Sequence, residues 1–560
     1  MSRRDFHLPW SEYVETLQPH ERPMLPGSPA TPDHTLGYRL AYAAVGLLVT
    51  ATGSIGMAMV SANTQQLAGA LGVSMTEAAW LPVVFVMTNA CMNLLLIKFR
   101  MQYGLRLFAE IFLIAYVLIG LGALFFEDYQ STLIVRAFAG MASAAMSSLG
   151  ILYLIQAFPA AHRLKGLIIG IGAASFALPA TRLFSSHLLE LSEWRGFHMF
   201  ELGLSLLSLA AVFALRAPPS ERLKVFEKLD FVTFALFAPG IALLCAVLGL
   251  GRLVWWTEAP WIGLALIGAI VLLTAALLVE YNRKTPLINL KWLAGGDIVR
   301  LALSILLVRI VMSEQSVGSV GLLQQLGVGP DQMHGLFAVI LLGTLIGTLT
   351  SAFTLNMAKL NKPIAIALAL IAVGAFLDAH ATALTRPEQM YFSQGLMAFA
   401  STLFIGPALM IGIVRVLQTG PQNLVSFIVV FAVGQNIAGL AGSALVGTVE
   451  QIRTQHHLSH LSDAITRGDP DVALRLQQLS GAYGSVIQDP ALRTTQGLTL
   501  MQQQLTQQAH VLAYNDVFLL IGWAAALGCA WVTFHHLRPR FAAHAAARRD
   551  AAQPADIAVD

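Results

Sequence analysis

Six ionisable side chains fall inside long apolar stretches of this 560-residue sequence. They are three arginines and three glutamates: Arg136, Arg182, Arg309, Glu110, Glu201 and Glu314. A guanidinium group binds carboxylates and other anions through paired hydrogen bonds, and a buried carboxyl group takes up and releases a proton. Either group is unfavourable in an apolar setting unless it faces a polar cavity or a partner. These residue types therefore predict an anion-binding site together with a proton-binding site.

The composition indicates that the apolar setting is a membrane. Hydrophobic residues make up 56% of the chain and charged residues 12%, and the mean hydropathy is +0.67. A helix needs about 20 apolar residues to cross a bilayer. Strands of a membrane barrel are shorter and alternate in polarity, unlike these continuous apolar runs. We expect an all-α polytopic protein with fourteen spans, at 38–62, 77–98, 105–126, 131–156, 163–187, 196–216, 228–251, 258–281, 297–322, 332–356, 361–382, 391–418, 424–449 and 514–536.

Lysine and arginine gather in the loops on one side of these spans. By the positive-inside rule that side is cytoplasmic, and the even number of spans places both termini there. The N-terminal segment is polar and rich in proline, so we do not expect a cleavable signal peptide. The expected organisation is a cytoplasmic tail (1–37), a six-helix bundle (38–216), a two-helix insertion (217–290), a second six-helix bundle (291–540) and a cytoplasmic tail (541–560).

The helical rise of 1.5 Å per residue places the buried charges along their spans. Arg309 lies about 14 Å from Arg300 at the inner edge, and therefore near the midplane of the membrane. Arg182 lies about 25 Å from Lys165, and Glu314 about 21 Å from Arg300, so both fall in the outer half. Arg182 has the alternative of extending to the outer surface, and Arg309 that of a structural ion pair.

The remaining charged groups differ in their expected depth. Arg136 and Glu201 enter from the outer edge and share the outer layer with Arg182. Glu110 lies only about 6 Å inside the cytoplasmic edge, which makes it a weaker candidate for proton binding. Asp378 and His380 fall near an outer helix end, where we expect them to lie at the interface with water.

Several kinds of chemistry find no support in the sequence. It has no phosphate-binding Walker loop, no dinucleotide fingerprint and no HExxH motif, so we expect neither an enzyme nor ATP-driven transport. The three cysteines show no spacing typical of a metal site or a disulfide framework. Three histidines between 456 and 460 lack the further ligands of a metal site. We therefore expect no metal and no other cofactor.

One hydrophilic insertion, at about 450–512, separates the last two spans. Its glutamines and spaced leucines predict a helical hairpin outside the membrane. The hairpin is either a long connector or a docking platform for a periplasmic partner.

Several motifs occur in the order and at the spacing of a known family. RAFAGMASA (136–144), with Gly140, resembles a fourth-helix motif in which small residues follow an arginine. EWRGF (193–197) resembles a sixth-helix signature, and VGQNIAGLAGSALVGT (433–448) resembles a glycine-rich signature and retains Gln435. Together they make residues 40–540 similar to the major facilitator superfamily, and most similar to the fourteen-span EmrB/QacA-like drug:proton antiporters.

The chain departs from that family at its acids. Met101 stands where the superfamily carries an aspartate, although Gly104 and Arg106 are kept. The first span lacks the aspartate that drug antiporters of this family carry. The fifth-span antiporter motif keeps Pro179 but has Arg182 where a glycine is usual.

The resemblance implies an antiporter of the cell inner membrane that uses the proton motive force to expel small amphiphilic compounds. It also implies two partners of a tripartite efflux pump, a HlyD-type periplasmic adaptor and an outer-membrane channel. From the residues we expect a cavity for an anionic or aromatic substrate, and coupling carboxylates to drive its release. The expected cavity residues are Arg182, Arg309 and Arg136, and the coupling residues are Glu314 or Glu201, with Glu110 weaker.

Two alternatives remain open at this point. The altered antiporter motif also permits proton-coupled uptake in the opposite direction. The missing acids permit a membrane sensor or scaffold that no longer transports, although the buried charges argue against that.

Overall fold

The computed structural model describes residues 10–23, 28–125, 128–420, 423–463, 465 and 469–552. Within these residues nearly all regular structure is helical, and the extended backbone pairs only in an isolated bridge between Pro29 and Ser220. Thirteen helices in the described part of the chain are long and apolar enough to cross a membrane. The prediction of an all-α polytopic membrane protein is confirmed. Residues 1–9, 24–27 and 553–560 of the two expected tails lie outside the described residues.

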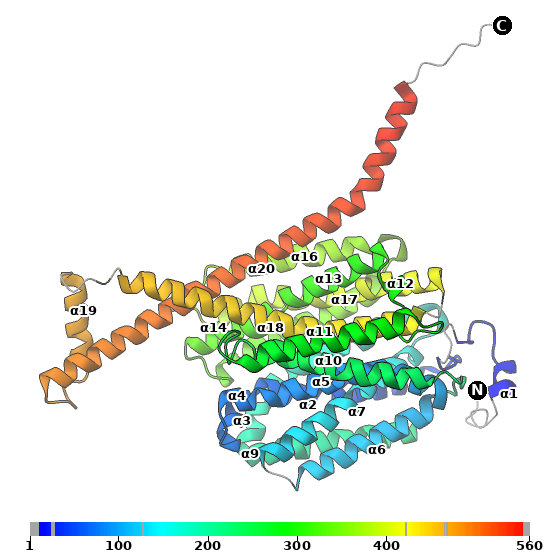
Figure 1. Ribbon diagram of the computed structural model, residues 1–560, viewed down its shortest axis with the longest axis horizontal. Coiled ribbons are helices and arrows are strands. Elements are labelled where there is room, and N and C mark those ends of the chain that lie inside the picture. The colour runs from blue at the N-terminus through cyan, green and yellow to red at the C-terminus, as the bar shows by residue number, and fades with distance from the viewer. Residues whose placement is uncertain are drawn as a thin grey trace.

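The first half of the chain forms one bundle (Figure 1). Its membrane helices are α2 (Leu36–Ala62), α5 (Trp80–Tyr103), α6 (Leu105–Ala123), α7 (Tyr129–Gln156), α8 (Arg163–Ala173) and α9 (Ala177–Ala214). The short helices α1 (Trp10–Glu15), α3 (Thr64–Leu71) and α4 (Met75–Ala78) lie at its ends. One apolar core, which includes Val49, Phe108, Leu149 and Val212, joins α2, α6, α7 and α9.

Two candidate membrane spans share α9: Ala160–Ser185, which begins before this helix, and Trp194–Ala214. Ser185 donates a hydrogen bond to Asn63 just beyond one end of α2. The hydroxyl oxygen of Ser208 lies 2.6 Å from that of Thr52, midway along α2. The carbonyl oxygen of Leu215 accepts a hydrogen bond from Tyr153, towards the end of α7. The two expected spans 163–187 and 196–216 therefore run in opposite directions.

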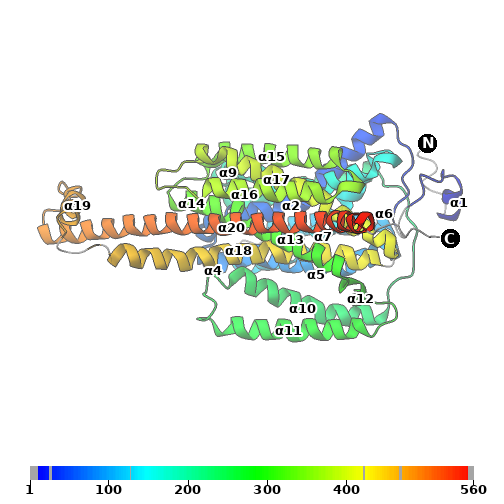
Figure 2. The same ribbon diagram turned by 90° about the horizontal axis from the view of Figure 1, so that it is seen from above.

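The insertion helices α10 (Lys228–Leu250) and α11 (Pro260–Tyr281) pack against each other and lie along one side of the molecule (Figure 2). Of the two, α10 packs against α5 of the first half and α18 of the second, and Trp261 of α11 lies against Trp80 of α5. The short helix α12 (Leu290–Leu293) then leads into the second half.

The second half forms the other bundle. Its helices are α13 (Gly296–Val311), α14 (Val320–Gln325), α15 (His334–Thr354), α16 (Asn361–Asp378), α17 (Tyr391–Thr419), α18 (Leu424–Asp463), α19 (Pro470–Gly481) and α20 (Pro490–Ala552). A second apolar core, which includes Val308, Ile371, Phe404 and Val517, joins α13, α16, α17 and α20. Short 3₁₀ segments connect helices in both halves: η2 (Ala160–His162), η3 (Ala174–Phe176), η5 (Asp331–Met333), η6 (Met357–Lys359) and η7 (Pro387–Met390).

The expected span at 297–322 is helical but broken. The helix α13 has 16 residues, and a π-helical segment, η4 (Glu314–Ser319), connects it to α14. A π turn widens the helix and often marks a functional site. No single piece of this path reaches the 18 residues of a membrane-crossing helix, which is why thirteen rather than fourteen such helices occur among the described residues.

Two long helices project beyond the bundles. The 40-residue α18 and the 63-residue α20 extend past one end of the molecule, where α19 lies between their tips (Figure 1). We call this the α19 end and the opposite one, where α1 lies, the α1 end. Asp516 of α20 binds Arg453 and His457 of α18, each at 2.6 Å. The expected helical hairpin at 450–512 is thus present in its described residues.

Candidate functional site

A cavity of about 520 Å³ lies between the two halves of the chain. Its walls come from α2, α5, α7, α8 and α9 on one side and from α13, η4, α15, α17 and α18 on the other. This volume is in the range of pockets that bind small organic molecules. Polar residues of the wall include Ser54, Asn89, Ser147, Gln315, Thr344, Gln435 and Asn436, and its aromatic residues are Phe85, Phe337 and Phe431.

Arg182 and Arg309 supply the positive charge of this cavity. They are the two arginines among the described residues of the wall, which includes no lysine, histidine, aspartate or glutamate. The cavity is therefore electropositive by composition, because no acidic side chain of its own wall neutralises the two guanidinium groups.

Arg182 lies on α9 and is directed towards the second half. Its guanidinium carbon is 5.4 Å from the ring centre of Phe337 on α15, a cation–π contact across the cavity. Its Nε is buried, and no described residue accepts a hydrogen bond from it or forms an ion pair with it. The expectation that Arg182 faces a cavity thus fits its position better than the alternative of an arginine extended to the surface.

Arg309 reaches the same cavity from α13. Its Nε is also buried without a hydrogen-bond partner among the described residues, so the alternative of a structural ion pair finds no partner there. A β-carbon built on Gly439 would lie 3.5 Å from Nη2 of Arg309. The glycine therefore leaves room for the guanidinium beside α18.

Arg136 and Glu201 lie outside the cavity wall and bind each other. Nη2 of Arg136 is 2.9 Å from Oε2 of Glu201, and the arginine is 1% exposed. Tyr116 donates a hydrogen bond of 2.7 Å to Oε1 of Glu201, and Trp194 lies over the guanidinium. Arg136 and Glu201 therefore do not share the cavity with Arg182 and Arg309. Each of the two neutralises the charge of the other inside the first bundle.

Glu314 lies at the start of η4 and is fully buried. Its carboxyl oxygens accept hydrogen bonds of 3.0 and 3.3 Å from Nε2 of Gln394 on α17. Glu314 does not line the cavity, although its neighbours Ser313 and Gln315 do. Glu314 and Arg309, five residues apart, do not pair: Glu314 accepts from Gln394, whereas Arg309 lines the cavity.

Asp378 is a buried group whose position the sequence did not indicate. It was expected at the interface with water, but it is 6% exposed and its Oδ2 accepts a 2.7 Å hydrogen bond from Gln394. His380, two residues later, is exposed as expected. The long α17 packs over the end of α16 and buries the carboxyl group of Asp378. The position of a residue near a helix end does not predict that another helix packs over it.

The other predicted residues fall into two places. Pro179 and Gln435 line the cavity. Glu110 is half-buried on α6, a helix that supplies no described residue of the cavity wall. Gly140 lies where α7 crosses α5, and a β-carbon there would be 2.3 Å from the carbonyl oxygen of Phe85. Gly140 thus permits close helix packing rather than contact with a ligand.

Gly104 and Arg106 form the turn between α5 and α6 at the α1 end. Gly104 has φ of +84°, a conformation that favours glycine. Arg106 donates a 3.0 Å hydrogen bond to the carbonyl oxygen of Ala217, and Leu223 donates to the carbonyl oxygen of Met101. The turn is therefore fastened to the segment that leads into the insertion.

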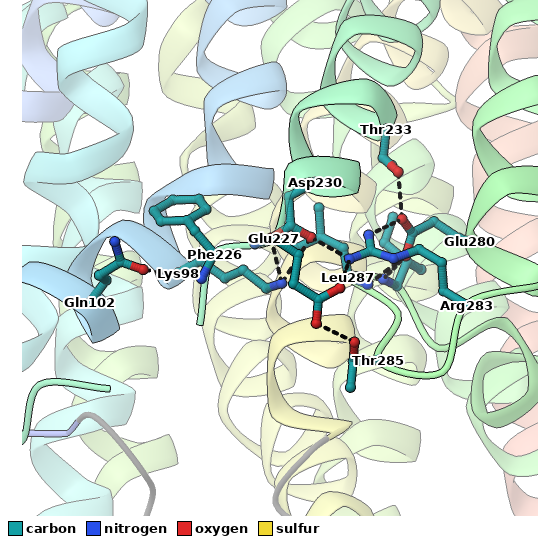
Figure 3. Close-up of polar contacts among 11 residues, drawn as sticks. Lys98, Gln102, Phe226, Glu227, Asp230, Thr233, Glu280, Arg283, Thr285 and Leu287 are labelled. Carbon is teal, nitrogen blue, oxygen red and sulfur yellow. Dashed lines mark hydrogen bonds and ion pairs between the residues drawn. The ribbon is translucent and has the colours of Figure 1, made fainter. Parts of the chain in front are cut away.

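A polar cluster at the α1 end connects α5 to the insertion. Asp230, at the start of α10, binds Lys98 of α5 at 2.7 Å and Arg283 at 2.9 Å. Figure 3 shows Arg283 also reaching Glu280 and Glu227, and Thr285 bonded to Glu227. Lys98 pairs with this acid one turn before Met101, where the superfamily aspartate is missing. The sequence analysis did not identify Asp230, because its partner Lys98 is far away along the chain.

The cluster shifts the pKa values of its groups outside the spans. Hydrogen bonds from Thr285 and then from Arg283 lower the pKa of Glu227. Burial alone lowers the pKa of Arg283, but its bonds to Glu280, Glu227 and Asp230 raise it overall. Both shifts favour the charged forms and so stabilise the cluster near neutral pH.

Comparisons with known proteins bear on the fold. No protein-family model matches the chain, and no curated protein matches it. Among solved structures, the human organic anion transporter MFSD10 is similar over 88% of this chain and 100% of its own, with a TM-score of 0.51 and 13% identity. The proton:xylose symporter XylE aligns with a TM-score of 0.49 and 14% identity over 88% of this chain and 95% of its own. A bacterial homologue of the human lysosomal transporter Spinster aligns with a TM-score of 0.43 and 15% identity, over 88% of this chain and 99% of its own.

The all-helical architecture of the described residues is consistent with the structural similarity of this chain to MFSD10. Two helical bundles enclose a central cavity. The chain is a multi-pass membrane protein with the fold of the major facilitator superfamily transporters.

Proposed function

We propose that this protein exports small amphiphilic organic anions, with aromatic carboxylates as the model class, in exchange for protons. The observation that carries the proposal is the pair Arg182 and Arg309, two half-buried arginines with buried Nε atoms and no ionic partners among the described residues, in one cavity whose described wall has no acid. A buried guanidinium without a counter-charge is unfavourable. A bound anion supplies that charge together with acceptors for the free N–H groups.

The rest of the wall suits the apolar part of such an anion. Phe85, Phe337 and Phe431 offer ring faces, and serine and asparagine side chains offer uncharged hydrogen bonds. The similar structure MFSD10 is described as an organic anion transporter, which supports the same substrate class.

Proton exchange is proposed from the buried acids. Glu314 lies beside the cavity without a counter-cation among the described residues, so it is the coupling group that we favour over Glu201, which Arg136 holds in an ion pair. No resident cofactor is proposed, and the driving force is the proton gradient.

The proposed location is the cell inner membrane, with the α1 end in the cytoplasm. The projection of α18, α19 and α20 then extends into the periplasm, where we propose that it docks a HlyD-type adaptor linked to an outer-membrane channel. Replacing residues 469–489 by a short glycine–serine linker tests this part. The expected result is lost export from cells with unchanged transport in liposomes, and unchanged export from cells would contradict the docking role.

Transport in proteoliposomes tests the function itself. In vesicles whose α1 end faces outward, an inside-acid gradient should drive accumulation of 1-naphthoate and related aromatic carboxylates, but not of lipophilic cations. Arg182→Gln should abolish this accumulation, and Arg415→Gln should not, because Arg415 is an exposed arginine bound to Asp297 outside the cavity. Cation accumulation that survives Arg182→Gln would overturn the proposal.

The same vesicles distinguish the two alternatives. Expulsion of preloaded naphthoate under the inside-acid gradient would indicate proton-coupled uptake in the cell. Binding of naphthoate without movement in either direction would indicate a sensor.

A further inference from the structure

Two carboxyl groups and one amide form a polar cluster inside the second half. Nε2 of Gln394 donates to Glu314 at 3.0 Å and to Asp378 at 2.7 Å. Gln394 and Glu314 are both 0% exposed. Ser393 donates a further hydrogen bond to Oδ1 of Asp378. The cluster joins η4, α16 and α17 at the α19 end of the bundle.

No cation of the described chain neutralises this cluster. Neither acid forms an ion pair with a described lysine, arginine or histidine. Two ionised carboxylates held by one amide and one hydroxyl group would be strongly destabilised by burial and by mutual repulsion. Carboxyl pairs that share a site hold a proton between them for this reason.

Other ionisable groups of the packed elements are engaged elsewhere. Arg309 of α13 lines the cavity, and Tyr514 of α20 lies against Gly321. Tyr391 of α17 lies against Gly335. On α18 and α20 the charged groups nearest in register bind one another: Glu450 with His510, and Asp516 with Arg453 and His457.

A hydrogen bond connects the cluster to a residue of the cavity wall. Gln315, which lines the cavity, donates a 3.1 Å hydrogen bond from Nε2 to the backbone oxygen of Gln394. Gln315 and Glu314 are consecutive in the π-helical segment, so one widened turn presents one side chain to the cavity and the other to the acids. Movement of η4 when the cavity fills would therefore alter the bridge between the carboxyl groups.

We propose that Glu314 and Asp378, bridged by Gln394, form one proton-binding site, and that Gln315 is the positioning residue that links its protonation to occupancy of the cavity. The inference rests on the proposed function and adds its second carboxyl group, its bridge and its connection. When the anion binds, the shared proton leaves a carboxyl oxygen for water, and no covalent bond to the substrate forms.

Proton release on ligand binding tests this site. In weakly buffered detergent solution with a pH indicator, 1-naphthoate is added to the full-length protein near neutral pH. The wild type should release protons as naphthoate binds. Glu314→Gln and Asp378→Asn should each bind naphthoate within about threefold of the wild-type Kd and release no proton. Glu388→Gln serves as the matched control, since Glu388 is an exposed glutamate in η7, and should behave like the wild type.

Gln315→Leu separates positioning from proton binding. It leaves both carboxyl groups in place, so we expect the proton to stay bound when naphthoate binds, and Gln315→Asn to restore release only in part. Unchanged release in Gln315→Leu would overturn the positioning role.

The remaining outcomes are distinct. Proton release that persists in Glu314→Gln and Asp378→Asn overturns the shared site while leaving the proposed function intact. Release of Na⁺ in place of protons by the wild type also overturns the site. A wild type that binds no aromatic carboxylate overturns the proposed function, and the inference with it.

Discussion

Arg182 on α9 and Arg309 on α13 line one cavity from opposite halves of the chain, and neither forms an ion pair with a described residue. Like charges in one cavity repel, so the arrangement is unfavourable unless an anion lies between them. A ligand held by one arginine from each half also connects the two bundles whose relative movement transport requires. In the proposed transport, this pair would therefore connect the recognition of charge with the conformational change.

The two arginines should contribute through geometry as well as charge. Arg309→Lys keeps a positive charge but loses the planar pair of donors. A hydrogen bond to a charged group contributes about 1.5–3 kcal/mol, so we expect Arg309→Gln to raise the Kd of 1-naphthoate about 10- to 100-fold. Arg309→Lys should lie between this variant and the wild type. Fluorescence titration measures the three values, and equal Kd values for all three would exclude Arg309 from the site.

Glu201 and Glu314 should respond differently to the same substitution. Glu201→Gln leaves Arg136 buried without its counter-charge, and the expected loss of stability is about 3–5 kcal/mol. Glu314→Gln resembles the protonated acid and removes no cation's partner, so the melting temperature in detergent should change little. Equal destabilisation by both substitutions would contradict the assigned roles.

Asp230 should be a strong contributor to stability at the α1 end. Its side chain is fully buried and binds Lys98 and Arg283, so Asp230→Asn should lower the free energy of unfolding by about 3 kcal/mol. Asp297→Asn is the control, because Asp297 is half-exposed and its pairs with Arg300 and Arg415 should contribute at most about 1 kcal/mol. Thermal melting of both variants measures the two losses of stability. A loss for Asp230→Asn no larger than that for Asp297→Asn would mean that the cluster does not stabilise the insertion.

Glu227 should make this cluster sensitive to acid. Its pKa is lowered in the folded protein, so its contribution to stability is present above the pKa of the unfolded chain, about 4.3, and is lost as the pH falls through the lower folded value. When the pH falls from about 6 to about 3.5, the melting temperature of the wild type should therefore fall further than that of Glu227→Gln. Parallel loss in both proteins would show that Glu227 does not carry this dependence.

Gly140 and Gly203 allow a paired test of helix packing. A β-carbon at Gly140 would lie 2.2 Å from Oγ1 of Thr88 and 2.3 Å from the carbonyl oxygen of Phe85, whereas one at Gly203 meets nothing within 4 Å. Gly140→Ala should destabilise the protein by about 1–3 kcal/mol. Gly203→Ala should be neutral or stabilise it by up to about 1 kcal/mol. A neutral Gly140→Ala would mean that α5 and α7 can separate without loss.

The sequence predicts the helices well because each span must satisfy its own backbone hydrogen bonds in the membrane. It also predicts that Arg182 and Arg309 face a cavity, since depth along a span makes a buried charge conspicuous. It does not predict that Arg136 pairs with Glu201, because depth alone does not tell which side of a helix meets which neighbour. The break at η4 is hidden for a similar reason: a π turn changes the register of a helix without changing its composition.

Buried partners that are distant in sequence were the least predictable. Gln394 bridges Asp378 and Glu314, and Asp230 reaches Lys98 across an interface between the insertion and the first half. No spacing rule connects these residues, because their proximity follows from how the helices pack.

Equilibrium binding of 1-naphthoate to the purified full-length protein tests the central claim most directly. The wild type should bind naphthoate more weakly as salt rises and should not bind a lipophilic cation of similar size. The double variant Arg182→Gln/Arg309→Gln should lose naphthoate binding while its melting temperature stays close to that of the wild type. Undiminished naphthoate binding by the folded double variant would contradict the account.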